Sequence, residues 1–119
     1  METGLNFGQA IQALNDGKRV SREGWNGKGL FVFKQVPADI TLDIVPKMQS
    51  LPQSVKDEFL RREQQAIELG GVTPPLKYRN QLAMVYPDNV IYGWVASPSD
   101  VLENDWCILD YKQPSPVRL

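Results

Sequence analysis

The sequence predicts an α+β fold, in which a small antiparallel β-sheet carries an N-terminal helix, a helical insertion and a short C-terminal helix. Three observations favour this class: an apolar stripe of helical period near the N-terminus, several short strand-like segments separated by turns, and a proline-bracketed interruption. We expect residues 1–119 to form a single domain, with an insertion at about residues 37–75 and a mobile tail at about residues 113–119. A chain of this length buries only about two-thirds of its unfolded surface, so oligomerisation would stabilise it.

The composition is that of an ordinary globular protein, with 42% hydrophobic and 23% charged residues. The net charge is −1 and no block of like charge occurs, which argues against binding to long nucleic acid. A small anionic ligand is compatible with this balance. Neither a long apolar run nor a signal-peptide pattern is present, so we expect no membrane association and a location in the cytoplasm.

The chain contains no histidine and a single cysteine, Cys107. An internal disulfide is excluded, as are Ser-His-Asp and Cys-His catalysis and zinc sites built on imidazole. We therefore expect no metal or other cofactor, and the composition favours binding over catalysis. Acid–base catalysis by carboxylates remains open.

The first element is predicted to be a helix that begins at Asn6. Asn6 and Gln9 have the spacing of a capping box, in which each side chain accepts a hydrogen bond from the backbone of the other residue. The apolar stripe behind it consists of Phe7, Ala10, Ile11 and Leu14. Residues 15–17, Asn-Asp-Gly, predict the end of this helix.

Residues 18–22 and 30–36 are predicted to be two strands joined by a glycine-rich turn. The second segment is apolar at successive positions, so we expect it to be covered on both faces. The two strands would form a hairpin or a wider loop, with Trp25 and Asn26 at its tip.

This turn has the residues that a nucleotide site needs. Its sequence is Arg22-Glu23-Gly24-Trp25-Asn26-Gly27-Lys28-Gly29. Trp25 can stack on a base, while Asn26 and the N–H groups of glycines such as Gly24 can make polar contacts. Arg22 and Lys28 are candidates for binding phosphate. The alternative is an ordinary turn anchored by its tryptophan.

Five prolines bracket residues 37–75, and the first part of this segment shows no clear period. Within it, Ser54 and Asp57 are spaced as a capping box that would open a charged helix. We expect this helix to run to about Leu69 and to end at Gly70 and Gly71.

The C-terminal part is predicted to contain a hairpin, a short helix and a last strand. Residues 81–86 and 90–97 alternate apolar and other side chains around the turn Pro87-Asp88-Asn89. Ser97 is a strong N-cap for a helix through about Glu103, with Asp100 at the third position. This N-terminus could bind an anion or a ribose, or Asp100 could fill the cap itself. Residues 106–111 form the predicted last strand.

Four motifs follow one another along the chain: Asn6-Phe7-Gly8-Gln9-Ala10, Val20 to Gly29, Gly93-Trp94-Val95-Ala96-Ser97 with Asp100, and Asp105-Trp106. In this order they resemble the small phage proteins known as the second type of Thoeris anti-defence protein. Together they cover most of the chain outside residues 37–75. That segment is longer than in compact members of the family.

The resemblance implies a homotetrameric sponge that binds a cyclic ADP-ribose isomer, glycocyclic ADP-ribose, and holds it without cleavage. The TIR-dependent Thoeris system of the infected cell is thereby blocked. Some relatives also bind cyclic dinucleotides at separate sites. The ligand-binding residues expected here are Arg22, Gly24, Trp25, Asn26, Lys28, Trp94, Ser97, Asp100 and Asp105.

Alternatives remain at this point, both for single residues and for the whole protein. Trp94 and Trp106 also fit core packing, because both lie in strand patterns. A nucleotide-hydrolysing enzyme would use Asp100, Asp105 or Glu23 as its base. A phage accessory protein without a small ligand is the third class.

Overall fold

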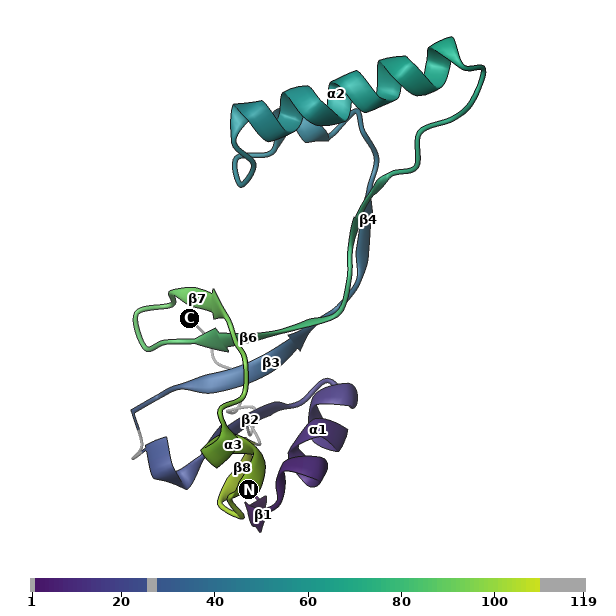
Figure 1. The fold of residues 1–119 in the computed structure, drawn as a ribbon. Coiled ribbons are helices and arrows are strands. Elements are labelled where there is room, and N and C mark those ends of the chain that lie inside the picture. The colour runs from purple at the N-terminus through teal and green to yellow at the C-terminus, as the bar shows by residue number, and fades with distance from the viewer. Residues whose placement is uncertain (1, 26–27, 110–119) are drawn as a thin grey trace, which may run out of the picture. The chain divides into compact units, whose positions relative to one another are not determined.

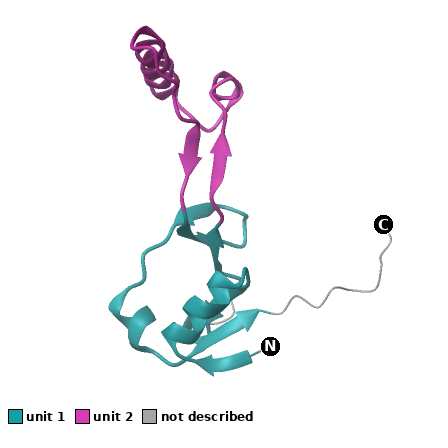
Figure 2. Cartoon of the chain, turned by 90° about the vertical axis from the view of Figure 1, so that its right-hand side faces the viewer, with its two compact units in different colours: residues 1–35, 80–119 teal, residues 36–79 magenta. Residues whose placement is uncertain are grey.

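The computed structural model describes residues 2–25 and 28–109 of the chain, and its fold is α+β, as predicted (Figure 1). The chain divides into two compact units (Figure 2). Unit 1 comprises residues 1–35 and 80–119, and unit 2 comprises residues 36–79. The predicted insertion therefore lies entirely within unit 2. No helix in the described part of the chain is long and apolar enough to cross a membrane.

Unit 1 is built on a six-stranded antiparallel sheet with the strand order β1-β8-β2-β3-β6-β7. Its strands are β1 (Glu2–Leu5), β2 (Arg19–Arg22), β3 (Phe31–Gln35), β6 (Gln81–Val85), β7 (Ile91–Gly93) and β8 (Trp106–Leu109). Val20 lies at the centre, opposite Val32 on one side and Ile108 on the other. Because these three positions share one face, they form a continuous apolar surface.

Helix α1 (Phe7–Asn15) covers this surface, and the predicted capping box is present. The Asn6 side chain accepts from the Gln9 backbone N–H at 2.8 Å, and Gln9 Oε1 accepts from the Asn6 N–H at 2.9 Å. Ala10 and Leu14 of the predicted stripe are buried. The helix therefore forms the second layer of the core.

The hairpin of β2 and β3 is confirmed, and the prediction that β3 is covered on both faces is partly met. Val32 is completely buried in the core beneath α1. Phe31 and Phe33 point to the opposite face and are only partly buried. Gly29 precedes β3 with a φ of 74°, a conformation that favours glycine.

The predicted hairpin of β6 and β7 is also present. The Asn89 N–H donates to the Tyr86 carbonyl at 2.8 Å, and Asn89 has a φ of 68°, which asparagine tolerates. Strand β7 ends at Gly93 instead of continuing to Ser97, because the chain turns there toward the N-cap of α3 (Pro98–Leu102).

Unit 2 contains a two-stranded antiparallel ribbon, β4 (Ala38–Ile40) with β5 (Leu76–Tyr78), the short 3₁₀ helix η2 (Val45–Lys47) and the helix α2 (Gln53–Glu68). The capping box predicted at Ser54 is wrong. Helix α2 begins at Gln53 behind Pro52, with no side-chain cap, because proline fixes the extended approach to the helix. Its end is as predicted, since Gly70 has a φ of 77°.

Candidate functional site

Three charged side chains from distant parts of the sequence meet beside the glycine-rich turn. Arg22 lies at the end of β2, Asp100 lies in α3, and Asp105 directly precedes β8. Arg22 Nη1 donates to Asp100 Oδ1 at 2.8 Å, and Arg22 Nε donates to Asp105 Oδ1 at 2.8 Å. Only 12% of the Arg22 side chain is exposed. Its guanidinium therefore ties the turn to α3 and β8.

Asp100 is held from a second direction by its own helix. The Asp100 N–H donates to Ser97 Oγ at 3.1 Å, and the Ser97 N–H donates to Asp100 Oδ2 at 2.8 Å. Burial raises the pKa of Asp100, but hydrogen bonds from Ser97 and Arg22 outweigh it and leave the pKa below its usual value. Asp100 thus fills the helix cap itself, the second of the two alternatives considered for this N-terminus.

Asp105 fixes the backbone at the start of the turn, at Glu23 and Gly24. Its Oδ2 accepts from the Gly24 N–H at 2.9 Å, and the hydrogen bond from Arg22 holds the pKa of the carboxyl below its usual value. A Cβ atom on residue 24 would lie 2.9 Å from Asp105 Oδ2 and 3.2 Å from Arg22 Nη2. Glycine is therefore required at position 24 by close packing against the ion pair.

A cluster of aromatic rings lies next to these charges. Trp25 packs edge-to-face on Trp106 at a centroid distance of 5.5 Å and on Trp94 at 6.4 Å. Trp106 is 1% exposed, and its Nε1 donates to the Asp100 carbonyl at 2.7 Å. Core packing is thus confirmed for Trp106, whereas Trp25 and Trp94 are partly buried at the edge of the core.

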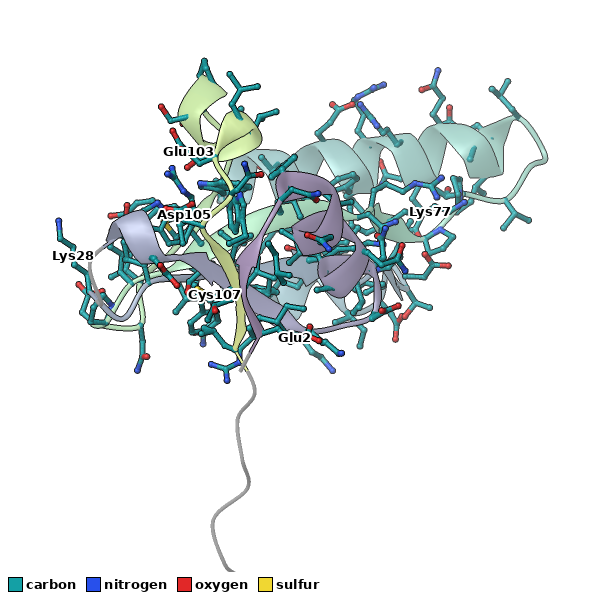
Figure 3. All side chains as sticks on the ribbon, turned by 90° about the horizontal axis from the view of Figure 1, so that it is seen from below. Glu2, Lys28, Lys77, Glu103, Asp105 and Cys107 are labelled. Atoms are coloured by element: carbon teal, nitrogen blue, oxygen red, sulfur yellow. The ribbon has the colours of Figure 1, made fainter. Side chains whose placement is uncertain are left out.

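A hollow of about 380 Å³ opens on the surface at the glycine-rich turn, within the roughly 300 to 1,000 Å³ typical of small-molecule sites. Its lining consists of Arg19, Ser21, Arg22, Trp25, Lys28, Gly29, Leu30, Phe31 and Leu109. The Arg19 guanidinium lies over the Phe31 ring, 5.1 Å from its centroid. Figure 3 shows the Lys28 side chain pointing away from the ribbon at the turn. Cationic, aromatic and hydroxyl groups therefore converge in one hollow.

The sequence pattern of the Tad2-like family, described as a Thoeris anti-defense 2-like domain, matches residues 5–109. The chain belongs to this family. It is also similar to Thoeris anti-defense 2 of Bacillus phage SP01, with 28% identity over 109 residues, covering 92% of this chain and 99% of the relative. The matched region includes every described residue of the charged cluster and of the hollow.

The predicted site residues of this Tad2-like domain fall into two groups. Arg22, Trp25 and Lys28 line the hollow. Gly24, Trp94, Ser97, Asp100 and Asp105 lie in the charged and aromatic clusters that adjoin the turn, where they contact other protein groups. Asn26 lies outside the described residues. Sequence reasoning missed Arg19 and Phe31, although alternation along β2 and β3 places both on the face opposite α1.

The carboxylates of this Tad2-like domain are poorly suited to act as bases. Asp100 and Asp105 both have lowered pKa values and accept hydrogen bonds from Arg22. A general base near neutral pH would need a raised carboxyl pKa. No group of three metal-ligating side chains occurs within residues 2–25 and 28–109. The hollow beside these carboxylates presents cationic and aromatic side chains, which are groups that contact small anionic ligands.

Proposed function

We propose that this Tad2-like domain is an anti-defence sponge. It binds a cyclic ADP-ribose isomer, glycocyclic ADP-ribose, in the cytoplasm of the infected bacterium and holds it unaltered, so that the TIR-dependent Thoeris effector receives no signal. The observation that carries the proposal is the Arg22–Asp100–Asp105 cluster, which holds the start of the glycine-rich turn beside a hollow lined by Trp25 and Lys28. Membership of the Thoeris anti-defence family supports it independently.

The hollow offers what such a ligand presents. Trp25 provides an aromatic surface for adenine, where stacking contributes about 1 to 3 kcal/mol per base. Lys28 and Arg19 supply positive charge for the two phosphates, each through hydrogen bonds of about 1.5 to 3 kcal/mol. Asn26 is the proposed donor to a ribose or phosphate oxygen.

The contacts of the charged cluster give Arg22 a different role from the phosphate binding expected for it. Its guanidinium is engaged by two carboxylates, and we assign it to holding the turn, together with Gly24, Ser97, Asp100 and Asp105. Trp94 supports Trp25 through an edge-to-face contact. Arg22, Gly24 and Trp25 are held before binding, so this part of the turn loses little entropy when the ligand arrives, which favours tight sequestration.

We extend the proposal to the assembly. A homotetramer would bring further copies of these residues together and stabilise a small domain. The proposal includes binding of cyclic dinucleotides at separate sites, as in some relatives, because this would also sequester a cyclic nucleotide signal. Titration with cyclic ADP-ribose isomers and with cyclic dinucleotides would measure which class of ligand this chain prefers.

The competing enzyme would use Asp100, Asp105 or Glu23 as a base. Arg22 keeps Asp100 and Asp105 ionised and weakly basic, and Glu23 lies exposed in the turn. Sequestration needs no proton transfer, so the same contacts favour it over hydrolysis.

Calorimetric titration with glycocyclic ADP-ribose tests the proposal. We expect Lys28→Ala to weaken binding by about tenfold or more, through the loss of one charge-assisted phosphate contact. Lys47→Ala, which removes an exposed lysine in unit 2, is the matched control and should bind as wild type does. A wild-type protein that gives no binding heat and no rise in melting temperature would favour the accessory class, because tight binding must stabilise the native state.

A further inference from the structure

A separate hollow of about 320 Å³ lies at the turn between β6 and β7 and is lined by Tyr86, Asp88, Val90 and Tyr92. Its lining follows from the register of the hairpin. Tyr86 lies opposite Val90, whose carbonyl accepts from the Tyr86 N–H at 2.9 Å, and Tyr92 lies two residues further along the chain in β7. Because side chains alternate along a strand, Tyr86, Val90 and Tyr92 project from one face of the hairpin.

The two tyrosine rings of this hollow form a corner. Their centroids are 5.3 Å apart and their planes meet at 86°, so the edge of one ring points at the face of the other. Tyr86 is 39% exposed and Tyr92 is 58% exposed, so solvent reaches both rings. The face of an aromatic ring attracts a cation within about 6 Å of its centroid. A cation in this corner would contact two rings at once.

Asp88 supplies a negative charge beside the rings. Its Oδ1 accepts from the Val90 N–H at 3.0 Å, and the Asn89 N–H donates to the Tyr86 carbonyl at 2.8 Å. An ionised carboxylate has about four acceptor positions, so Asp88 can also accept from a bound group. These bonds hold the carboxylate next to Tyr86 before a ligand arrives, which lowers the entropy lost on binding.

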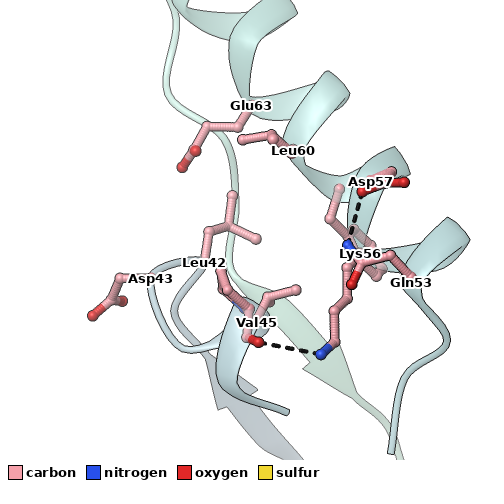
Figure 4. Close-up of a pocket in the computed structure, with 10 residues that line it drawn as sticks. Leu42, Asp43, Val45, Gln53, Lys56, Asp57, Leu60 and Glu63 are labelled. Atoms are coloured by element: carbon pink, nitrogen blue, oxygen red, sulfur yellow. Dashed lines mark hydrogen bonds between the residues drawn. The ribbon is translucent and has the colours of Figure 1, made fainter. Parts of the chain in front are cut away.

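The charge of this hollow differs from that of three others in the described part of the chain. Its four lining residues carry one formal charge, the negative charge of Asp88. The other three each include at least one cation: Lys56 in the hollow of Figure 4, Arg62 and Lys77 in the second hollow along α2, and Arg19, Arg22 and Lys28 at the glycine-rich turn. Cations in a lining repel an incoming positive charge, so a cationic ligand is favoured at the β6–β7 turn.

We propose that the β6–β7 turn binds a small organic ammonium ion, with the charged group in the corner of the two tyrosines and against Asp88. Carbon atoms of the ion would lie on Val90. Each contact at an exposed site is weak, so we expect a dissociation constant on the order of 1 to 10 mM. The inference concerns a cation at a different turn and does not rest on the proposed anionic ligand.

The first test separates charge from shape. Choline and 3,3-dimethyl-1-butanol have the same shape, but a carbon replaces the charged nitrogen in the alcohol. In NMR titrations to about 20 mM, choline should shift the ring resonances of Tyr86 and Tyr92, and the alcohol should bind at least about threefold more weakly. The ring of Tyr78 in β5 is the internal control and should not respond. No shift with choline, or equal binding of the alcohol, overturns the proposal.

The same titration distinguishes two sources of the ammonium group. Putrescine presents it on a free diamine, and lysine blocked at both backbone ends presents it as a peptide would. Binding of either compound supports the site, and the tighter of the two identifies the source. Failure of both to shift the two tyrosines contradicts the proposal for primary ammonium ions.

Two substitutions locate the site. Asp88→Asn keeps an oxygen for the Val90 N–H but removes the charge, so choline binding should weaken about threefold. Tyr92→Leu removes one wall of the corner and should weaken binding by about the same factor. Asp39→Asn, which removes an exposed carboxylate on β4, is the matched control and should bind as wild type does. Unchanged binding in either Asp88→Asn or Tyr92→Leu, with far-UV circular dichroism showing an intact fold, would overturn the proposal.

Discussion

Arg22 is the residue on which the account of the site depends most. Its fork is satisfied by two carboxylates that approach from α3 and from the start of β8. Both partners are themselves tied to backbone N–H groups, Asp100 to Ser97 and Asp105 to Gly24. A single side chain thereby fixes three separate segments of unit 1.

Replacing Arg22 tests this role. Arg22→Ala should lower the free energy of unfolding by about 3 kcal/mol, because it leaves two little-exposed carboxylates without their partner. Arg22→Lys should recover only part of this loss, since an ammonium cannot reproduce the fork. Denaturant unfolding measures both, with Lys28→Ala as a control that should change stability by no more than about 0.5 kcal/mol. An Arg22→Ala protein as stable as the control would refute the structural role.

The same cluster makes stability depend on pH in a defined direction. The folded-state pKa values of Asp100 and Asp105 lie below the ordinary value of 3.8. Their contribution is therefore fully present above pH 3.8 and is lost as the pH falls through the lower folded-state values. Unfolding measured from about pH 5 to about pH 2 should show this loss in wild type and much less of it in Arg22→Ala. Equal acid dependence in the two proteins would contradict the assignment.

At the scale of elements, short-range sequence signals predicted the helices α1 and α3 correctly. Strands that depend on pairing with distant residues were not predicted. The capping boxes at Asn6 and Ser97 specified α1 and α3, because both partners lie three residues apart. Strand β1 was not predicted, since its sequence Glu-Thr-Gly-Leu has no strand pattern and its pairing with β8 comes from far along the chain. Strands β4 and β5 were missed for the same reason.

In the candidate site too, local sequence signals were informative and long-range contacts could not be predicted. The sequence indicated Trp25 and Lys28 from the composition of one turn, and both line the hollow. The pairing of Arg22 with carboxylates 78 and 83 residues away could not be derived from spacing. For that reason we expected Arg22 to bind phosphate. In the structure its guanidinium instead donates to Asp100 and Asp105.

The junction between the glycine-rich turn and β3 is sensitive to one substitution. Gly29 has a φ of 74°, and a Cβ there would lie 3.3 Å from Pro87 Cγ in the β6–β7 turn. We expect Gly29→Ala to cost about 1 to 2 kcal/mol of stability through backbone strain, measured by thermal unfolding. Gly93→Ala is the matched control, because nothing lies within 4 Å of its added Cβ. Similar losses of stability in the two variants would contradict the expectation that backbone strain at position 29 causes the loss.

At the scale of the whole molecule, the two units carry different features. Unit 1 holds the charged cluster, the aromatic cluster and the hollow, all within the region matched by the Tad2-like family. Unit 2 holds two hollows that are lined in part by α2. On this account the ligand is bound by unit 1.

The central claim is that the signal is held and not consumed. The most direct measurement incubates the protein with glycocyclic ADP-ribose, removes unbound ligand, denatures the protein and identifies the released molecule by chromatography and mass spectrometry. The account predicts intact ligand in stoichiometric amount, with no increase in altered product over time. Altered product that accumulates with turnover would contradict the account and establish an enzyme.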